Sequence, residues 1–271
     1  TAPATYPLTI TGTCGGVSRT TNVMLVVTAA PGSGALTGVV TTPASSYNLT
    51  ALGSADWIQW GLSSATSVNR KAGVTPQISN ITMVGSGSVG NYANDPIGFS
   101  WTGGTPSASA TNTTTGVYVY GQNNGFRLTV PADTTPRTLT IYFGVWAARG
   151  RMVAHLSDGS AADYVDTSLN NVGGIARGQY SLNYRAAVSG QTLTITYTVD
   201  QSHSGDWGNV SLQAATLVDG APSPDFSVST TPASQSVVAG GSTNYTVTVT
   251  ALGGFSSTVA LSVTGLPAGV Q

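Results

Sequence analysis

The densest group of residues that could bind a ligand lies at residues 54–73, where tryptophans stand beside carboxylate, amide and cationic side chains. Sugars expose apolar C–H faces and hydroxyl groups, so a glycan site combines aromatic platforms with hydrogen-bonding side chains. Similar combinations recur around residue 92 and around residue 207. The predicted carbohydrate-binding residues are therefore Asp56, Trp57, Trp60, Arg70, Tyr92 and Trp207.

The tryptophans also suit a hydrophobic core. Trp57 and Trp60 are three residues apart, so on a strand they face opposite sides of the sheet. At least one of them is then expected inside the domain. Trp101 and Trp146 have apolar strand residues as neighbours, and we expect both in the core.

Arg70 and Asp56 have structural alternatives to ligand binding. Arg70 precedes Lys71, and two adjacent cations suit a solvated turn. A buried ion pair between Asp56 and Arg70 would instead hold two strands together without binding anything.

Catalytic and metal-binding patterns are weak. The ten acidic residues are all aspartates, and a glycosidase would need two of them about 5–10 Å apart. No serine lies in a G-x-S-x-G motif, and two histidines with the single Cys14 make a poor zinc set. The close spacing of Asp158, Asp163 and Asp166 suits a turn as well as a Ca²⁺ site. We therefore expect that the protein is not an enzyme and binds no cofactor, with a bound Ca²⁺ ion as the alternative.

The charge content excludes several classes of partner. Charged residues are 7% of the 271 residues, against about a quarter in typical soluble chains. The net charge is −1 and Lys and Arg do not cluster, so neither nucleic acid nor an anionic membrane surface is expected as a partner. No apolar run reaches the roughly 18 residues of a membrane span. Few charges with abundant Thr, Ser, Gly and Asn indicate an extracellular protein of a bacterial cell surface.

Residues 34–218 carry the pattern of a complete all-β domain. Apolar and polar residues alternate at 138–145 and at 192–199, as in strands with one buried face. Frequent Gly-containing turns between short strands predict a jelly-roll-like β-sandwich. Ser189-Gly190 separates two alternating stretches and predicts a two-residue hairpin at this point.

The two ends of the chain resemble parts of one kind of domain. The informative stretches are residues 6–13, 23–27, 225–228, 239–242, 245–249, 254–255 and 265–269. Through them, residues 225–271 resemble the first strands of the immunoglobulin-like tandem repeats of bacterial secreted proteins, and residues 1–30 resemble the last strands of the same repeat. The resemblance implies partial β-sandwich segments on both sides of the central domain, with a linker at 219–224.

Because the tail of a repeat comes first and its head comes last, we expect either a tandem array or subunits joined head to tail by strand complementation. The hypothetical subunit joint contains Leu8, Ile10, Leu25, Val27, Tyr245, Val247, Val249, Val259 and Leu261. The expected function is a non-catalytic extracellular structural or adhesive protein that self-associates into an array or filament. The alternative is polysaccharide binding, because the central domain looks like the β-sandwich carbohydrate-binding modules of bacterial polysaccharide-active proteins.

Overall fold

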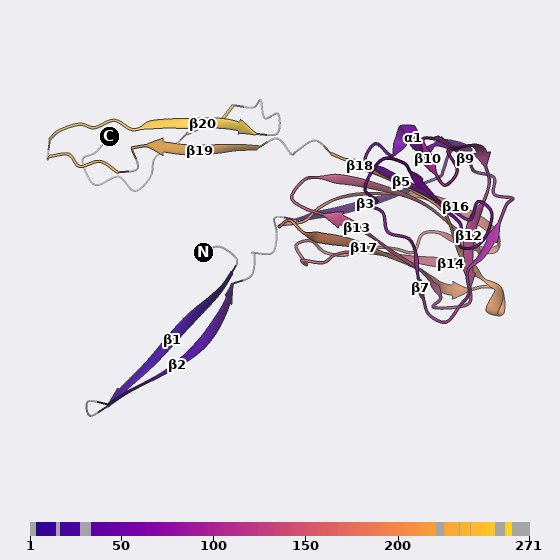
Figure 1. Ribbon diagram of the computed structural model, residues 1–271, viewed down its shortest axis with the longest axis horizontal. Coiled ribbons are helices and arrows are strands. Elements are labelled where there is room, and N and C mark those ends of the chain that lie inside the picture. Colours follow the sequence, from indigo (N-terminus) through magenta and orange to yellow (C-terminus); the bar gives the residue numbers. More distant parts are fainter. Residues whose placement is uncertain are drawn as a thin grey trace. The chain divides into compact units, whose positions relative to one another are not determined.

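The structure is a computed structural model of the chain. It describes residues 4–14, 17–27, 34–220, 225–232, 234–238, 240–252 and 258–261. The chain divides into two compact units, residues 1–220 and 221–271 (Figure 1). Strands dominate the described residues, with one short helix, α1 (Leu49–Leu52), and one 3₁₀ turn, η1 (Gly205–Trp207). This composition of elements confirms the predicted all-β, sandwich-like class, as expected from abundant Thr, Val and aromatic residues.

The central domain is a β-sandwich whose two layers share one strand. β14 is 20 residues long and pairs with different strands along its two halves. Its register shifts after Trp146 and after Arg149, and between them Ala147 has a φ of 43°. Bulges of this kind bend a strand, so β14 passes from the first layer into the second.

The first layer contains the first half of β14 (Arg137–Leu156), β16 (Asn170–Arg185), β18 (Asn209–Asp219), β12 (Gly116–Tyr120), β8 (Gly90–Tyr92), β3 (Ala35–Thr41), β5 (Asp56–Trp60), β6 (Val68–Lys71) and β10 (Gly104–Thr105). The second layer contains the second half of β14, β15 (Tyr164–Asp166), β17 (Gln191–Ser202), β13 (Gly125–Ala132) and β7 (Thr82–Val84). All pairings within these layers are antiparallel.

The main core lies between the two layers. The rings of Phe143 on β14 and Tyr197 on β17 stack with centroids 4.1 Å apart. The predicted alternation is confirmed on both strands, since their buried core residues are Leu139, Ile141, Phe143 and Val145 on β14 and Leu193, Ile195, Tyr197 and Val199 on β17.

The hairpin predicted at Ser189-Gly190 is wrong. Gly190 has a positive φ of 78°, as in a turn, but β16 and β17 do not pair with each other. β16 pairs with the first half of β14, whereas β17 pairs with the second half. The turn therefore carries the chain from one layer to the other, and each strand buries its apolar face from its own side of the core.

A third, smaller layer covers part of the outer face of the first layer. It consists of α1 with the three-stranded sheet of β4 (Ser46–Asn48), β9 (Gly98–Thr102) and β11 (Ser109–Thr113). The rings of Phe99 and Tyr142 lie 4.9 Å apart, and those of Trp57 and Trp101 lie 5.6 Å apart. These contacts form a second core between the cover and the sheet. The cover stops short of Trp146, where the outer face of the sheet remains open.

Each end of the chain contains one antiparallel strand pair. β1 (Ala4–Cys14) pairs with β2 (Val17–Val27), with Leu8 opposite Val23. β19 (Asp225–Thr231) pairs with β20 (Thr246–Leu252). A two-stranded pair alone is marginally stable in water.

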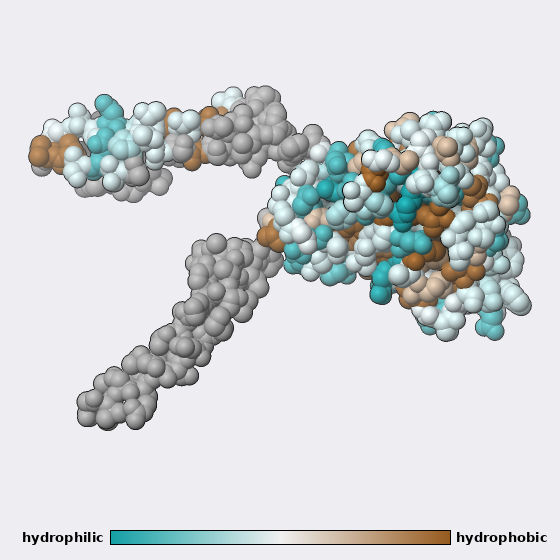
Figure 2. Space-filling model, in the orientation of Figure 1, coloured by the Kyte–Doolittle hydropathy of each residue, from teal (hydrophilic) through white to brown (hydrophobic). Residues whose placement is uncertain are grey.

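The residues of the predicted subunit joint lie in and around these pairs. Leu8, Ile10, Leu25 and Val27 lie in β1 and β2, and their side chains fall outside the described part of the chain. In the second unit the exposed members are Tyr245, Val247, Val249 and Leu261, while Val259 is partly buried. Figure 2 shows hydrophobic residues at the surface of this unit among polar ones.

Candidate functional site

The open half of the outer face of the first layer carries two adjacent rows of side chains. In antiparallel strands, residues two apart point to the same face, and paired residues stand side by side. One row runs across β12, β18, β14 and β16 through Tyr118, Ser211, Gly144 and Arg177. The next row runs through Tyr120, Asn209, Trp146 and Ile175.

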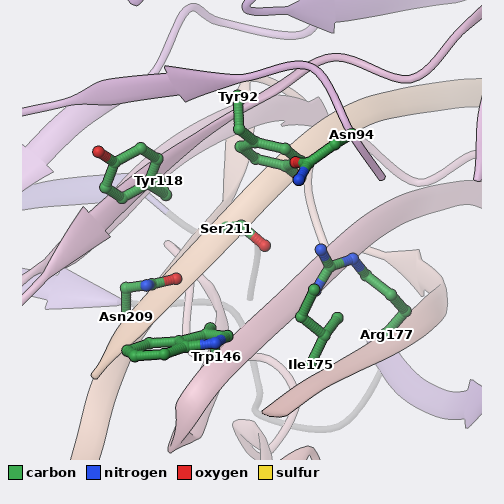
Figure 3. Close-up of a pocket in the computed structure, with 8 residues that line it drawn as sticks. All are labelled: Tyr92, Asn94, Tyr118, Trp146, Ile175, Arg177, Asn209 and Ser211. Carbon is green, nitrogen blue, oxygen red and sulfur yellow. The ribbon is translucent and has the colours of Figure 1, made fainter. Parts of the chain in front are cut away.

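Apart from Gly144 and Tyr120, the residues of these rows line a cleft of about 260 Å³. Tyr92, at the end of β8, and Asn94, in the following loop, add a wall to it, and Figure 3 shows the lining side chains arranged around an open space. Trp146 is 38% exposed, so its ring is available to a ligand. The lining residues are Tyr92, Asn94, Tyr118, Trp146, Ile175, Arg177, Asn209 and Ser211.

A buried ion pair stands beside the cleft. Arg177 donates from Nε to Oδ2 of Asp95 at 2.6 Å, its Nη2 lies 2.5 Å from the same oxygen, and the two side chains are 11% and 0% exposed. The other oxygen of Asp95 accepts a hydrogen bond from the backbone N–H of Ile97 at 3.1 Å. Arg177 is the only charged residue that lines the cleft among the described residues. Its charge is therefore balanced within the protein, and the cleft offers little attraction to an anion.

Two buried hydroxyl groups in the cleft have no hydrogen-bond partner among the described residues, those of Tyr92 and Ser211. Burial, together with the nearby Asp95 carboxylate, raises the pKa of Tyr92, so its hydroxyl stays protonated and able to donate. Most buried polar groups in proteins are paired. Both oxygens are buried, so they lie beneath the surface of the cleft and not on it.

Glycines make room for the polar groups of the cleft. A Cβ on Gly144 would lie 2.5 Å both from Nη1 of Arg177 and from Oγ of Ser211. A Cβ on Gly116 would lie 2.5 Å from the hydroxyl oxygen of Tyr92. Any side chain at either position would displace these groups.

Three of the predicted carbohydrate-binding residues are buried, and this placement removes them from the site. Asp56 accepts hydrogen bonds from the backbone N–H groups of Trp57, Gln77 and Ile78, so its carboxylate organises the chain locally. Trp57 lies in the second core beneath the covering layer. Trp60 lies in the main core and donates from Nε1 to the side chain of Asn80 at 2.8 Å.

Arg70 also lies outside the cleft. Its Nη1 donates to the backbone carbonyl of Ile78 at 2.6 Å, and burial lowers the pKa of its guanidinium although Asp56 acts to raise it. No ion pair joins Arg70 to Asp56 in the part of the chain that the structure describes. The hydrogen bond to the Ile78 carbonyl therefore fixes the Arg70 side chain away from the cleft.

Tyr92 is the one predicted residue that lines this cleft. Trp207 lies in η1 and is 66% exposed, with its ring 5.7 Å from that of Tyr120. Trp101 is in the core as expected, whereas the prediction of a buried Trp146 is wrong. Trp146 lies on the outer face of β14, whereas its neighbour Val145 lies on the face that packs in the core.

Sequence reasoning missed most of the lining residues. Strand alternation is the sequence signal that could have identified Tyr118, because Tyr118 and Tyr120 alternate with the buried Val117 and Val119. The other missed lining residues come together only through strand pairing, which the sequence pattern does not specify. The missed lining residues are Tyr118, Trp146, Ile175, Arg177, Asn209 and Ser211.

Comparison with protein-family models, with curated proteins and with solved structures finds no match for this chain. Within the described ranges, no three His, Cys, Asp or Glu residues gather into a group suited to a metal ion. In the same ranges, no helix has the length and apolar character needed to cross a membrane.

Proposed function

We propose that this chain is a non-catalytic, extracellular carbohydrate-binding protein whose central domain, residues 34–220, holds a neutral glycan in the cleft. The observation that carries the proposal is the exposed Trp146 ring beside the side-chain amides of Asn94 and Asn209 in one cleft. An aromatic ring stacks on the apolar face of a sugar, and the amides meet its hydroxyl groups.

The charge of the cleft favours a neutral sugar over an acidic one. Arg177 is already paired with Asp95 through a hydrogen bond and an ion pair, so a carboxylate or sulfate on the ligand would have to compete with a buried partner. The amides of Asn94 and Asn209 can donate to and accept from hydroxyl groups. Binding near 1 mM, about −4 kcal/mol, is the expected order for such a shallow site.

Binding of soluble neutral and uronic oligosaccharides to the full chain, measured by calorimetry, tests this proposal. We expect neutral sugars to bind and Trp146→Ala to weaken them by about tenfold or more, whereas Trp146→Phe keeps part of the affinity. Val165→Ala is the control, because Val165 is half exposed on β15 and does not line this cleft. Unchanged binding by Trp146→Ala, or binding of uronic sugars alone, would contradict the proposal.

A second candidate function, self-association, is favoured by the apolar surface of the second unit. Val228 on β19 stands opposite Val249 on β20, and both are exposed, as is Val247. We propose that this face takes up the β1–β2 pair of another copy, because β1 and β2 pair only with each other among the described residues. Strand pairs that associate in this way form an open chain of subunits.

Analytical ultracentrifugation over a range of concentrations tests the assembly. The full chain should form larger species as concentration rises, and Val247→Asp with Val249→Asp should leave it monomeric. Val165→Asp places the same charge on an exposed strand position of the central domain and serves as the control. A monomer at every concentration, or assembly that survives the double substitution, would refute this role.

A further inference from the structure

A second cleft lies next to the first along β12. It has a volume of about 370 Å³ and is lined by Tyr120, Gln122, Asn124, Asp206 and the small residues 86–88. Asn124 holds the surrounding loops, since it accepts from the N–H of Ser86 at 3.0 Å and donates to the carbonyl of Tyr120 at 2.9 Å. Gln122 and Asp206 are exposed and line the cleft, and no hydrogen bond joins either side chain to another described residue.

Aromatic rings connect the two clefts. Ring centroids are 6.4 Å apart from Tyr92 to Tyr118, 6.5 Å from Tyr118 to Tyr120 and 5.7 Å from Tyr120 to Trp207. Tyr118 lines the first cleft and Tyr120 the second, and they share the outer face of β12 because they are two residues apart. Trp207 therefore extends a continuous aromatic row beyond the first cleft.

The row is not flat. Successive rings are tilted by 53°, 35° and 37°. A planar surface, such as the face of a crystalline polysaccharide, can contact only rings that are nearly coplanar. A single soluble chain that turns as it advances can contact each ring in order.

We infer that Tyr120 and Trp207, with Gln122 and Asp206, form a second sugar-binding subsite, so that the ligand is a single soluble glycan chain that spans both clefts. This inference rests on the proposed carbohydrate-binding function and adds the length and physical state of its ligand. The carboxylate of Asp206 accepts hydrogen bonds from sugar hydroxyls, and the exposed ring of Trp207 stacks on a sugar face.

Chain-length dependence of binding is the test. Affinities of the full chain are measured by calorimetry for cello-, malto- and xylo-oligosaccharides from the disaccharide to the hexasaccharide. For the series that binds, the hexasaccharide should bind about tenfold more tightly than the disaccharide, because a second stacked sugar adds favourable contact. Trp207→Ala should remove this gain and leave the disaccharide affinity unchanged, whereas Trp146→Ala should weaken every length.

The outcomes separate the two ideas. Equal affinity for all lengths, with binding still dependent on Trp146, overturns the second subsite and leaves the carbohydrate-binding function in place. Binding to crystalline cellulose in preference to the soluble oligosaccharides also overturns the inference. No binding of any of these glycans overturns both. Val165→Ala, which lines neither cleft, should behave as the unsubstituted chain at every length.

Discussion

The outer face of the first layer has a covered half and an open half, and the same strands supply both. Tyr142 and Trp146 lie on the same face of β14, yet Tyr142 is 2% exposed and Trp146 is 38% exposed. Strand alternation therefore determines which face a side chain occupies, and the third layer determines whether an aromatic residue on that face is buried or exposed.

The largest difference is expected between alanine substitutions of one tryptophan in each half, since one should mainly lower stability and the other should mainly weaken glycan binding. Trp57→Ala, in the covered half, should lower the free energy of unfolding by about 3–5 kcal/mol because it leaves a large cavity. Trp146→Ala, in the open half, should lower it by about 1 kcal/mol while removing glycan binding. Urea denaturation and calorimetry measure the two effects, and similar losses of stability in both variants would erase the distinction between the halves.

Removing the negative charge beside the cleft should have the next largest effect. Asp95→Asn leaves the buried Arg177 without a charged partner and should cost about 3 kcal/mol of stability together with glycan affinity. The matched control is Asp163→Asn, whose pair with His155 is about half exposed, so its loss should cost less than about 1 kcal/mol. If the two variants unfold at the same urea concentration, the buried pair does not support the open half.

Filling the space beneath the cleft should have an intermediate effect. Gly144→Ala places a Cβ against Arg177 and Ser211 and should cost about 1–3 kcal/mol, with weaker glycan binding. Gly173→Ala is its control, because no heavy atom lies within 4 Å of the added Cβ. Thermal unfolding and calorimetry report both quantities, and full affinity in Gly144→Ala would show that the floor of the cleft tolerates a shift.

The smallest effect is confined to alkaline pH. Burial raises the pKa of Tyr142 in the covered half, with Tyr47 adding to the shift. An unfolded tyrosine ionises near pH 10, so above that pH the unfolded state binds fewer protons than the folded state, and stability falls as pH rises. Tyr142→Phe should leave stability unchanged below about pH 9 and make the alkaline fall shallower. Urea denaturation across this pH range measures it, and an equally steep fall would exclude Tyr142 as a source.

The sequence was sufficient for the strands but not for their pairing. Alternation predicted the buried faces of β14 and β17, because a period of two is a local property. It did not predict that the turn at Ser189-Gly190 crosses between layers, since a turn residue does not fix the partner of the next strand. The prediction that Trp57 binds a ligand is wrong for a related reason, because two strands of the layer that covers it, β9 and β11, come from a separate part of the chain.

The course of β14 through both layers determines whether the domain can be divided. One continuous strand supplies the central hydrogen-bonded partner in both layers, first to β16 and β18 and then to β15 and β17. Neither layer keeps its sheet if the other is removed, so the domain cannot be halved or rebuilt one layer at a time. We therefore expect it to be transferable between proteins only as a whole block, and the proposed glycan cleft would move with it, because Trp146 lies at the bend.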